Sequence, residues 1–281
     1  DEMVYRFTGE QGIARTKIAY VSEVKGAREL FVMDYDGHGR RQVTADGFLN
    51  LMPRWSPDRR FLFFTSYRTR TTQDLVALEL SSGKREVLVS AESLNITPAV
   101  SPDGTALAYA TSLDGNAEIY RLDLVTKSRE RLTFHAGGDL SPTWSPSGHE
   151  LAFTSDRSGR PQVYVMGSDG SNARRITFQG EYNGAPTWSP RGDWIAHVCR
   201  VPEGYKICVT SPDGRERRQI TTGPGIDDSP SWSPDGRHLV FSSSIDGRSA
   251  IYMINADGDK RSRERLTSGE QYSSTPAWSP A

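Results

Sequence analysis

Short apolar runs that alternate with polar turns recur along the whole chain, and inside each run the hydrophobic period is two residues. A first run is followed by a polar loop containing Gly and then by a second run; the clearest first runs are residues 107–109, 151–153, 195–197 and 239–241, and the second runs are 118–120, 162–164, 206–208 and 250–252. Runs of this length bounded by Asp-Gly and Pro-Gly turns are typical of antiparallel strands joined by hairpins. The pattern predicts an all-β chain.

An in-frame Ser-Pro pair marks each repeat of this pattern. Its prolines lie 44 to 46 residues apart, at Pro57, Pro102, Pro146, Pro190, Pro234 and Pro280, and five of the six tryptophans share the frame: Trp55, Trp144, Trp188, Trp232 and Trp278. Four short strands in about 44 residues correspond to one propeller blade. We therefore predict a six-bladed β-propeller of four-stranded antiparallel blades.

The two ends of the chain complement each other. Residues 276–281 resemble the first strand of a blade without the rest, and residues 17–22 resemble a second strand without a first. We expect the N- and C-terminal strands to pair and close the ring, which removes an unpaired sheet edge. This assigns residues 1–16 to a lead-in and 17–281 to the propeller. Because the chain starts at Asp1, we expect a processed product or a piece of a longer protein.

The repeated tryptophans and Ser-Pro-Asp-Gly tetrads have structural interpretations that we prefer. An aromatic residue at a fixed place in each blade is expected to pack between neighbouring sheets. In the tetrads Pro presets φ, Asp caps its own backbone and Gly adopts positive φ. The out-of-frame copy at residues 211–214 is expected to connect two strands of one blade.

Charge and composition exclude several partners. The 281 residues are 36% hydrophobic and 25% charged, and Lys+Arg 34 against Asp+Glu 35 leaves a net charge of -1. Nucleic acids and acidic membrane surfaces attract basic proteins, so we expect neither as a partner. No apolar run approaches the ~18 residues that a membrane helix needs, so we expect no membrane insertion.

Catalytic motifs are not found in the sequence. The five histidines lie in different repeats without zinc-ligand spacing, and there is no Gly-x-Ser-x-Gly elbow and no phosphate-binding Gly-rich loop. We expect no enzymatic activity and no required cofactor.

Cys199 and Cys208 lie on consecutive predicted strands and would sit opposite each other if the hairpin were symmetric about residues 200–206. A disulfide and two buried thiols both remain open.

A polar residue recurs shortly before each framed Pro, in the loop that enters the first strand of a blade: Asn50, Asn95, Asp139, Asn183, Asp227 and Ser273. These side chains either shape the turns by accepting backbone N–H groups or form a polar ring around the channel mouth. A ring of carboxylate and amide oxygens suits a peptide or a hard cation. Calcium at the channel mouth would use Asp139, Asp227 and Asp228.

Apolar and aromatic residues lie beside this polar ring in the sequence: Leu49, Leu51, Met52, Leu94, Ile96, Leu140, Tyr182, Ile226 and Tyr272. Such residues next to exposed polar loops are typical of a protein interface rather than of a small polar substrate pocket.

Three stretches resemble the TolB family, the periplasmic propeller proteins of the Tol–Pal system. They are residues 7–21 (FTGEQGIARTKIAYV), 153–164 (FTSDRSGRPQVY) and 276–280 (PAWSP). The resemblance covers essentially the whole chain. It implies that an α/β domain precedes the propeller, and that residues 1–16 are the last segment of that domain.

The resemblance implies a monomeric, non-enzymatic scaffold in the periplasm that supports outer-membrane integrity and cell division. Family members bind the peptidoglycan-associated lipoprotein over the channel mouth, colicin translocation peptides use the same place, and calcium is associated with the channel. Carried over by motif position, the implied partner contacts are Leu94, Asn95, Ile96 and Thr97, Asp139, Leu140 and Ser141, Asn183, Gly184 and Ala185, and Asp227, Asp228 and Ser229.

Two other functions compete with the adaptor. The propeller could be the gating domain of a prolyl-oligopeptidase-like serine peptidase, which would require a hydrolase domain in the same gene. A carbohydrate-active propeller would need several carboxylates and histidines converging in the channel, and the predicted ring supplies few.

Overall fold

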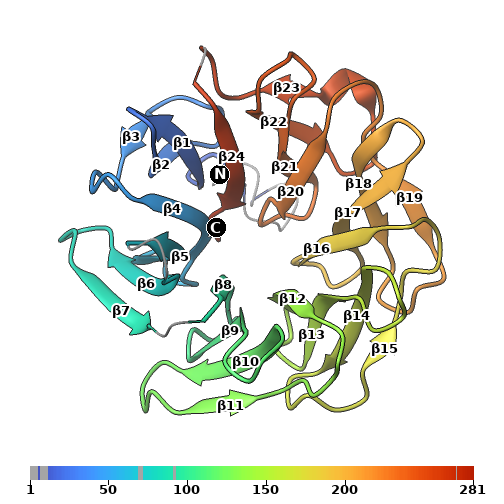
Figure 1. The fold of residues 1–281 in the computed structure, drawn as a ribbon. Helices are drawn as coiled ribbons and strands as arrows, with labels where there is room; N and C mark the ends of the chain where they lie inside the picture. The colour runs from blue at the N-terminus through green and yellow to red at the C-terminus, as the bar shows by residue number, and fades with distance from the viewer. Residues whose placement is uncertain (1–5, 7–11, 69–71, 91–92, 270) are drawn as a thin grey trace.

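The structure is a computed structural model that describes residues 6, 12–68, 72–90, 93–269 and 271–281, and strands arranged around a central axis form nearly all of its regular secondary structure. Most of the predicted lead-in, residues 1–5 and 7–11, lies outside the described residues. Six inner strands face the axis: β4, β8, β12, β16, β20 and β24 (Figure 1). Each comes from one copy of the repeat. In the described residues no helix is long and apolar enough to cross a membrane.

Four separate sheets each contain four antiparallel strands in chain order. Their strands are β8 (Asn95–Val100), β9 (Ala106–Thr111), β10 (Glu118–Asp123) and β11 (Arg129–Arg131); β12 (Asp139–Trp144), β13 (Glu150–Ser155), β14 (Gln162–Gly167) and β15 (Arg174–Arg175); β16 (Asn183–Trp188), β17 (Ile195–Val201), β18 (Gly204–Thr210) and β19 (Arg217–Gln219); and β20 (Asp227–Trp232), β21 (His238–Ser243), β22 (Ala250–Asn255) and β23 (Glu264–Arg265). A short 3-10 helix, η1 (Lys260–Ser262), precedes β23.

The other eight strands form one continuous sheet, which corrects the prediction of six separate four-stranded blades. The sheet contains β24 (Ser273–Trp278), β1 (Lys17–Val24), β2 (Ala27–Asp34), β3 (Arg41–Gln42), β4 (Leu49–Trp55), β5 (Phe61–Tyr67), β6 (Asp74–Glu79) and β7 (Arg85–Val89). A parallel pair between Arg28 and Leu49 joins its two halves, because the loop from β3 brings the start of β4 beside β2. The structure therefore has four separate blades and one eight-stranded sheet.

The predicted pairing of the chain ends is confirmed. β24 is antiparallel to β1, with Ile18 opposite Trp278 and Ala19 opposite Ala277. The backbone N–H of Ser279 also donates to the carbonyl of Lys17 at 2.8 Å. The last strand of the chain thus becomes the inner strand beside the first.

The framed tryptophans pack between neighbouring sheets, as predicted, and some of them also hydrogen-bond to the preceding inner strand. The indole N–H of Trp55 donates to the carbonyl of Ala277 at 2.9 Å, and that of Trp144 donates to the carbonyl of Ala99 at 3.0 Å. Both acceptors lie on the preceding inner strand. Each of these tryptophans therefore combines apolar burial with one interstrand hydrogen bond.

The Ser-Pro-Asp-Gly tetrads are turns, as predicted. In the copy that follows β8, the hydroxyl of Ser101 donates to Asp103, and the N–H of Gly104 donates to the Ser101 carbonyl at 2.9 Å. Gly104 has φ 74, a conformation that glycine adopts without steric cost. The out-of-frame copy connects β18 and β19 in the same way, through Gly214 and Ser211.

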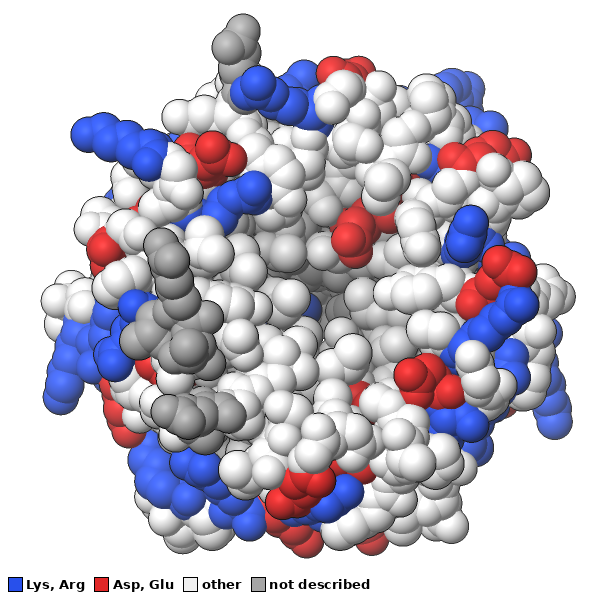
Figure 2. All heavy atoms as spheres, in the orientation of Figure 1, with Lys and Arg blue, Asp and Glu red and all other residues white. Residues whose placement is uncertain are grey.

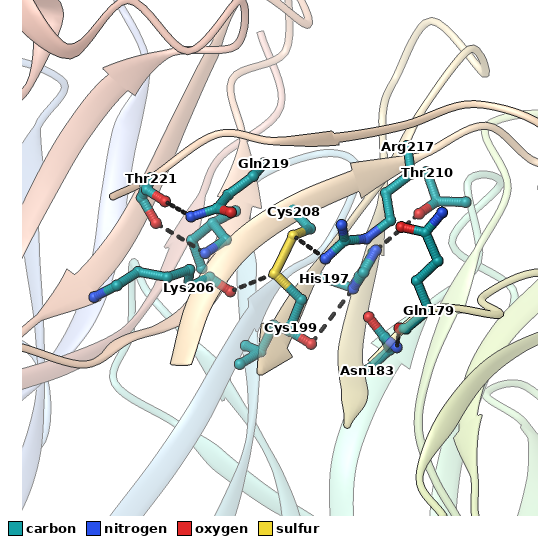
Figure 3. The surroundings of a disulfide bond; sticks show 12 residues. Gln179, Asn183, His197, Cys199, Lys206, Cys208, Thr210, Arg217, Gln219 and Thr221 are labelled. Carbon is teal, nitrogen blue, oxygen red and sulfur yellow. Dashed lines mark hydrogen bonds between the residues drawn. A yellow bond between two sulfur atoms is a disulfide. The ribbon is translucent and has the colours of Figure 1, made fainter. Parts of the chain in front are cut away.

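Cys199 of β17 and Cys208 of β18 form a disulfide with Cα atoms 5.8 Å apart (Figure 3). The symmetric hairpin considered from the sequence was wrong in register. Val201 pairs with Gly204 across a tight turn, which places Cys199 opposite Lys206. The two cysteines are therefore diagonal neighbours, which still allows their side chains to meet.

His197 lies opposite Cys208 with its ring fully buried. Its Nε2 atom is 2.9 Å from the hydroxyl of Thr210. Burial lowers the pKa of His197 to about 4; the hydrogen bond with the Val198 carbonyl raises it, and the positive charge of Arg217 lowers it. The imidazole is therefore neutral in the folded protein near pH 7.

Trp278→Ala is expected to lower the free energy of unfolding by about 3–5 kcal/mol, because it removes a buried indole from the closing strand. It also removes the hydrogen bond from the indole to the hydroxyl of Thr16 at 2.8 Å. Chemical denaturation followed by circular dichroism would measure this. Phe134→Ala, at an aromatic residue that is 73% exposed, is the matched control and should change stability by less than about 0.5 kcal/mol. Equal effects of the two substitutions would contradict this account of closure.

Acid should destabilise the fold through His197. The pKa of His197 is about 4 in the folded protein and about 6.5 in the unfolded chain. The contribution of the neutral imidazole to the free energy of unfolding is therefore fully present above about pH 6.5 and is lost as the pH falls toward 4. The total loss is about 3 kcal/mol. His197→Phe introduces the residue type found at the equivalent positions Phe153 and Phe241 and should remove that part of the pH dependence. Denaturant unfolding at several pH values compares the two proteins. Identical pH profiles would show that His197 is not responsible.

Candidate functional site

The polar residues that begin the inner strands are buried rather than exposed around the channel. The relative exposure of Asn50, Asp139, Asn183 and Asp227 is 0%, and that of Asn95 is 1%. The sequence placed these side chains either in the turns or in a ring at the mouth. The structure places them inside the protein, between the inner strand and the sheet that precedes it.

Asp227 makes the densest set of these buried contacts. One carboxylate oxygen accepts from the Ser243 hydroxyl at 2.5 Å, and the other accepts from the guanidinium of Arg263 at 2.9 Å. The fully buried ammonium of Lys206 is 3.8 Å from the same carboxylate and donates to the carbonyl of Gly225. These contacts fix the loop that enters β20.

Asp139 occupies the equivalent position on β12. Its carboxylate accepts from the guanidinium of Arg157 at 2.7 Å. Burial raises the pKa of Asp139, while the hydrogen bond from Ser155 and the charge of Arg157 act in the opposite direction. A buried carboxylate that is held by an arginine stabilises the local fold and is not available to a partner at the surface.

The same junction is built without an arginine elsewhere in the ring of strands. The amide of Asn183 donates to Gln162 at 3.0 Å, and Thr177 donates to the same Gln162 oxygen at 2.8 Å. At the start of β4, the amide of Asn50 and the hydroxyl of Thr44 both donate to Glu29. At these two junctions the repeated polar residue connects its loop to the third strand of the preceding repeat.

A β-bulge with positive φ follows each of these buried residues. The residue two positions later has φ between 46 and 57 in all six inner strands: Met52, Thr97, Ser141, Ala185, Ser229 and Thr275. The pairing register with the second strand shifts at the same places. Non-glycine residues rarely adopt this conformation, and such strain commonly accompanies functional sites.

The bulges determine which of the implied partner contacts reach the mouth. Asp228 is exposed, and Leu94, Ile96, Leu140, Ser141, Ala185 and Ser229 are partly exposed. Asn95, Thr97, Asp139, Asn183, Gly184 and Asp227 are buried. The second and third residues of each inner strand, rather than the first, therefore tend to form the accessible surface.

One hollow at the mouth combines several of these residues. Its volume is ≈ 540 Å³, and it is lined by Leu49, Leu51, Met52, Ile226, Asp228, Ser229, Tyr272 and four further serines and a threonine, together with Arg28. Five of the nine apolar and aromatic neighbours noted in the sequence thus meet between β4, β20 and β24, and Leu94, Ile96, Leu140 and Tyr182 do not line this hollow. Figure 2 shows this face, where mostly uncharged side chains surround the central hollow and most charged groups lie toward the periphery.

Asp228 and Arg28 are the charged residues of this mouth hollow. The carboxylate of Asp228 accepts from the backbone N–H and hydroxyl of Ser229, and no cation pairs with it among the described residues. The guanidinium of Arg28 stacks 3.7 Å over the ring of Tyr272 and lies 3.7 Å from Glu23. Arg28 was not predicted as a site residue, because it lies on β2 and reaches Tyr272 only through ring closure.

Arg54 of β4 is a second residue that the sequence analysis missed. It lines a cavity in the central channel of ≈ 500 Å³ to which all six inner strands contribute. The equivalent residues of the other inner strands are small and uncharged: Ala99, Thr143, Thr187, Ser231 and Ala277. Alignment of the repeats would have revealed Arg54 as the exception.

The three carboxylates proposed for calcium do not form one coordination sphere. Asp139 and Asp227 are paired with different arginines, and only Asp228 is exposed. Within the described ranges, no group of three or more His, Cys, Asp or Glu side chains is placed to hold a metal ion. The donor set does not fit Ca²⁺ in this arrangement, and calcium binding stays an untested prediction.

Comparisons with known proteins agree with the fold and the repeat. The family described as "TolB beta propeller domain" matches residues 4–281. A Tol-Pal system protein TolB from Desulfosudis oleivorans is 36% identical over 121 residues, which is 43% of this chain and 27% of that protein. The match thus spans well under two thirds of the length of this relative.

Solved structures give two further likenesses. TolB from Acinetobacter baumannii has a TM-score of 0.91 and 32% identity, covering 100% of this chain and 71% of that one. The tricorn protease has a TM-score of 0.70 and 17% identity, covering 90% of this chain and 26% of that one. The second likeness shows the fold alone.

Asp227→Ala is expected to lower the free energy of unfolding by about 3–5 kcal/mol, because it leaves the fully buried Lys206 and the largely buried Arg263 without their carboxylate. Asp228→Ala, one residue along the chain and exposed, should change stability by less than about 0.5 kcal/mol. Urea unfolding at pH 7 measures both. A loss below 1 kcal/mol for Asp227→Ala would contradict the structural role assigned to the buried ring.

Proposed function

Since the chain belongs to the TolB β-propeller domain family, we propose that it is a non-enzymatic periplasmic scaffold of the Tol–Pal system. In this role it binds the peptidoglycan-associated lipoprotein at the channel mouth and so supports outer-membrane integrity and cell division. Colicin translocation peptides use the same surface. The protein acts as a monomer and requires no cofactor.

The composition of the mouth hollow carries this proposal. Leu49, Leu51, Met52 and Ile226 supply an accessible apolar surface, with Leu49 41% and Ile226 53% exposed. Exposed apolar side chains grouped beside polar ones are typical of protein interfaces. The bulge residues supply backbone and hydroxyl groups for orientation.

Asp228 gives the surface its selectivity. Its carboxylate lies in the hollow without a cationic partner among the described residues. A partner that places a basic side chain there would form a partly desolvated ion pair, while an acidic group would be repelled. The buried members of the ring act indirectly, by holding the loops that present this surface.

The competing peptidase-gate function requires a hydrolase domain joined to this propeller. The likeness to the tricorn protease concerns the fold only, and the family match favours the scaffold. We therefore assign this chain no catalytic role.

Calorimetric titration with the soluble lipoprotein domain from the same genome tests the proposal. We expect saturable binding that Ile226→Asp weakens at least tenfold and that Asp228→Ala weakens severalfold. Asp213→Ala, at an exposed carboxylate in the β18–β19 hairpin, should leave the affinity unchanged. Absence of binding by the folded wild-type chain, or equal loss in all three variants, would overturn the assignment of the mouth.

A further inference from the structure

One guanidinium, that of Arg54, lies among the described residues that line the central channel, and no acidic side chain lines the cavity beside it. Among the residues that line the channel cavity, Arg54 has the only ionisable side chain. One of its terminal nitrogens donates to the carbonyl of Pro53 at 2.8 Å, and no carboxylate pairs with it in the part of the chain that the structure describes. No other hydrogen bond of this guanidinium to a protein acceptor is found among the described residues.

The repeat makes this arginine an exception that packing does not require. Thr143 and Thr187 occupy the equivalent positions of two other inner strands, and each strand forms the same bulge and the same pairing with its second strand. A threonine at position 54 would therefore suit the backbone. The positive charge of Arg54 is therefore not required for the backbone conformation of β4.

The surroundings of Arg54 leave room for a ligand and offer additional donors. The cavity has a volume of ≈ 500 Å³, and hydroxyl groups of Thr143, Thr187 and Ser231 line it together with the arginine. A carboxylate, a phosphate or a halide ion is far smaller than this volume. Figure 2 shows a small basic area at the bottom of the central hollow.

Burial of this charge has an energetic cost that an anion would offset. Protein that surrounds the guanidinium lowers the pKa of Arg54 to about 10, with desolvation as its cause. The side chain is still protonated at neutral pH. A guanidinium held in a protein cavity is stabilised when an anionic oxygen or a halide approaches the edge of its plane, where the N–H donors point outward.

We propose that the central channel contains an anion-binding site centred on Arg54. Its ligand is a small anion, either a free inorganic ion or the carboxylate of a peptide segment that enters the channel. The guanidinium supplies the charge and two parallel N–H donors, and the hydroxyls on the facing strands complete the contacts. The site does not depend on the function proposed for the mouth.

Bromide diffraction tests the location directly. Crystals soaked in sodium bromide should show an anomalous peak about 3–3.5 Å from the Arg54 guanidinium, and crystals of Arg54→Thr should lack it. A wild-type cavity without a peak, or a peak that persists in the variant, would overturn the proposal.

Thermal unfolding tests it in solution and distinguishes the sources of the anion. At constant ionic strength, phosphate should raise the melting temperature of the wild-type chain in a saturable way. Arg54→Thr should abolish this increase, Arg54→Lys should keep a weaker one, and Arg41→Thr on the exposed strand β3 should leave it intact. An equal response in wild type and Arg54→Thr would mean a general salt effect and would refute the site. Replacing phosphate by acetate tests whether a carboxylate also raises the melting temperature. A saturable increase with acetate favours the carboxylate of a peptide as the ligand. An increase with phosphate alone favours an inorganic ion.

Discussion

Pairing between β1 and β24 is the constraint on which the rest of the structure depends. It makes residues near the two ends of the chain adjacent, so that Trp278 lies in a core beside Ile18 and Tyr20. It also brings Tyr272 under the guanidinium of Arg28 and completes the mouth hollow with Ser274 and Thr275. Without this pairing, two sheet edges would be exposed and neither the mouth nor the channel would have a complete wall.

Buried polar junctions between repeats are the second feature that holds the ring of strands together. A propeller must turn its chain from the outer strand of one repeat to the inner strand of the next, and the backbone groups in that turn need partners. Here the first residue of the inner strand meets a polar side chain of the preceding repeat, as Asn183 meets Gln162 and Asp227 meets Lys206. The charge of the paired side chains differs between these two junctions, but their positions in the repeat are the same.

The mouth and the channel have opposite electrostatic preferences. Asp228, a carboxylate without a cationic partner in the described part of the chain, lies at the mouth, and Arg54, a guanidinium that pairs with no carboxylate there, lies further along the axis. A segment entering the channel would meet first a site that favours positive charge and then one that favours negative charge. The guanidinium also opposes a divalent cation in the same channel, which bears on the calcium predicted from the sequence.

The sequence by itself determined the all-β class, the repeat, the turns and the pairing of the two ends, because strand period, Pro-Asp-Gly turns and tryptophan spacing are local properties. It also identified Leu49, Ile226 and Asp228 as members of an accessible surface. It could not determine that β2 and β4 join two sets of four strands into one sheet, nor that Cys199 lies opposite Lys206, because both depend on register. Tertiary structure alone decided that Asp139 and Asp227 are buried ion-pair partners and that Arg54 faces the channel. A side chain's exposure depends on which strands surround it, and an inner strand is surrounded by residues from all parts of the chain.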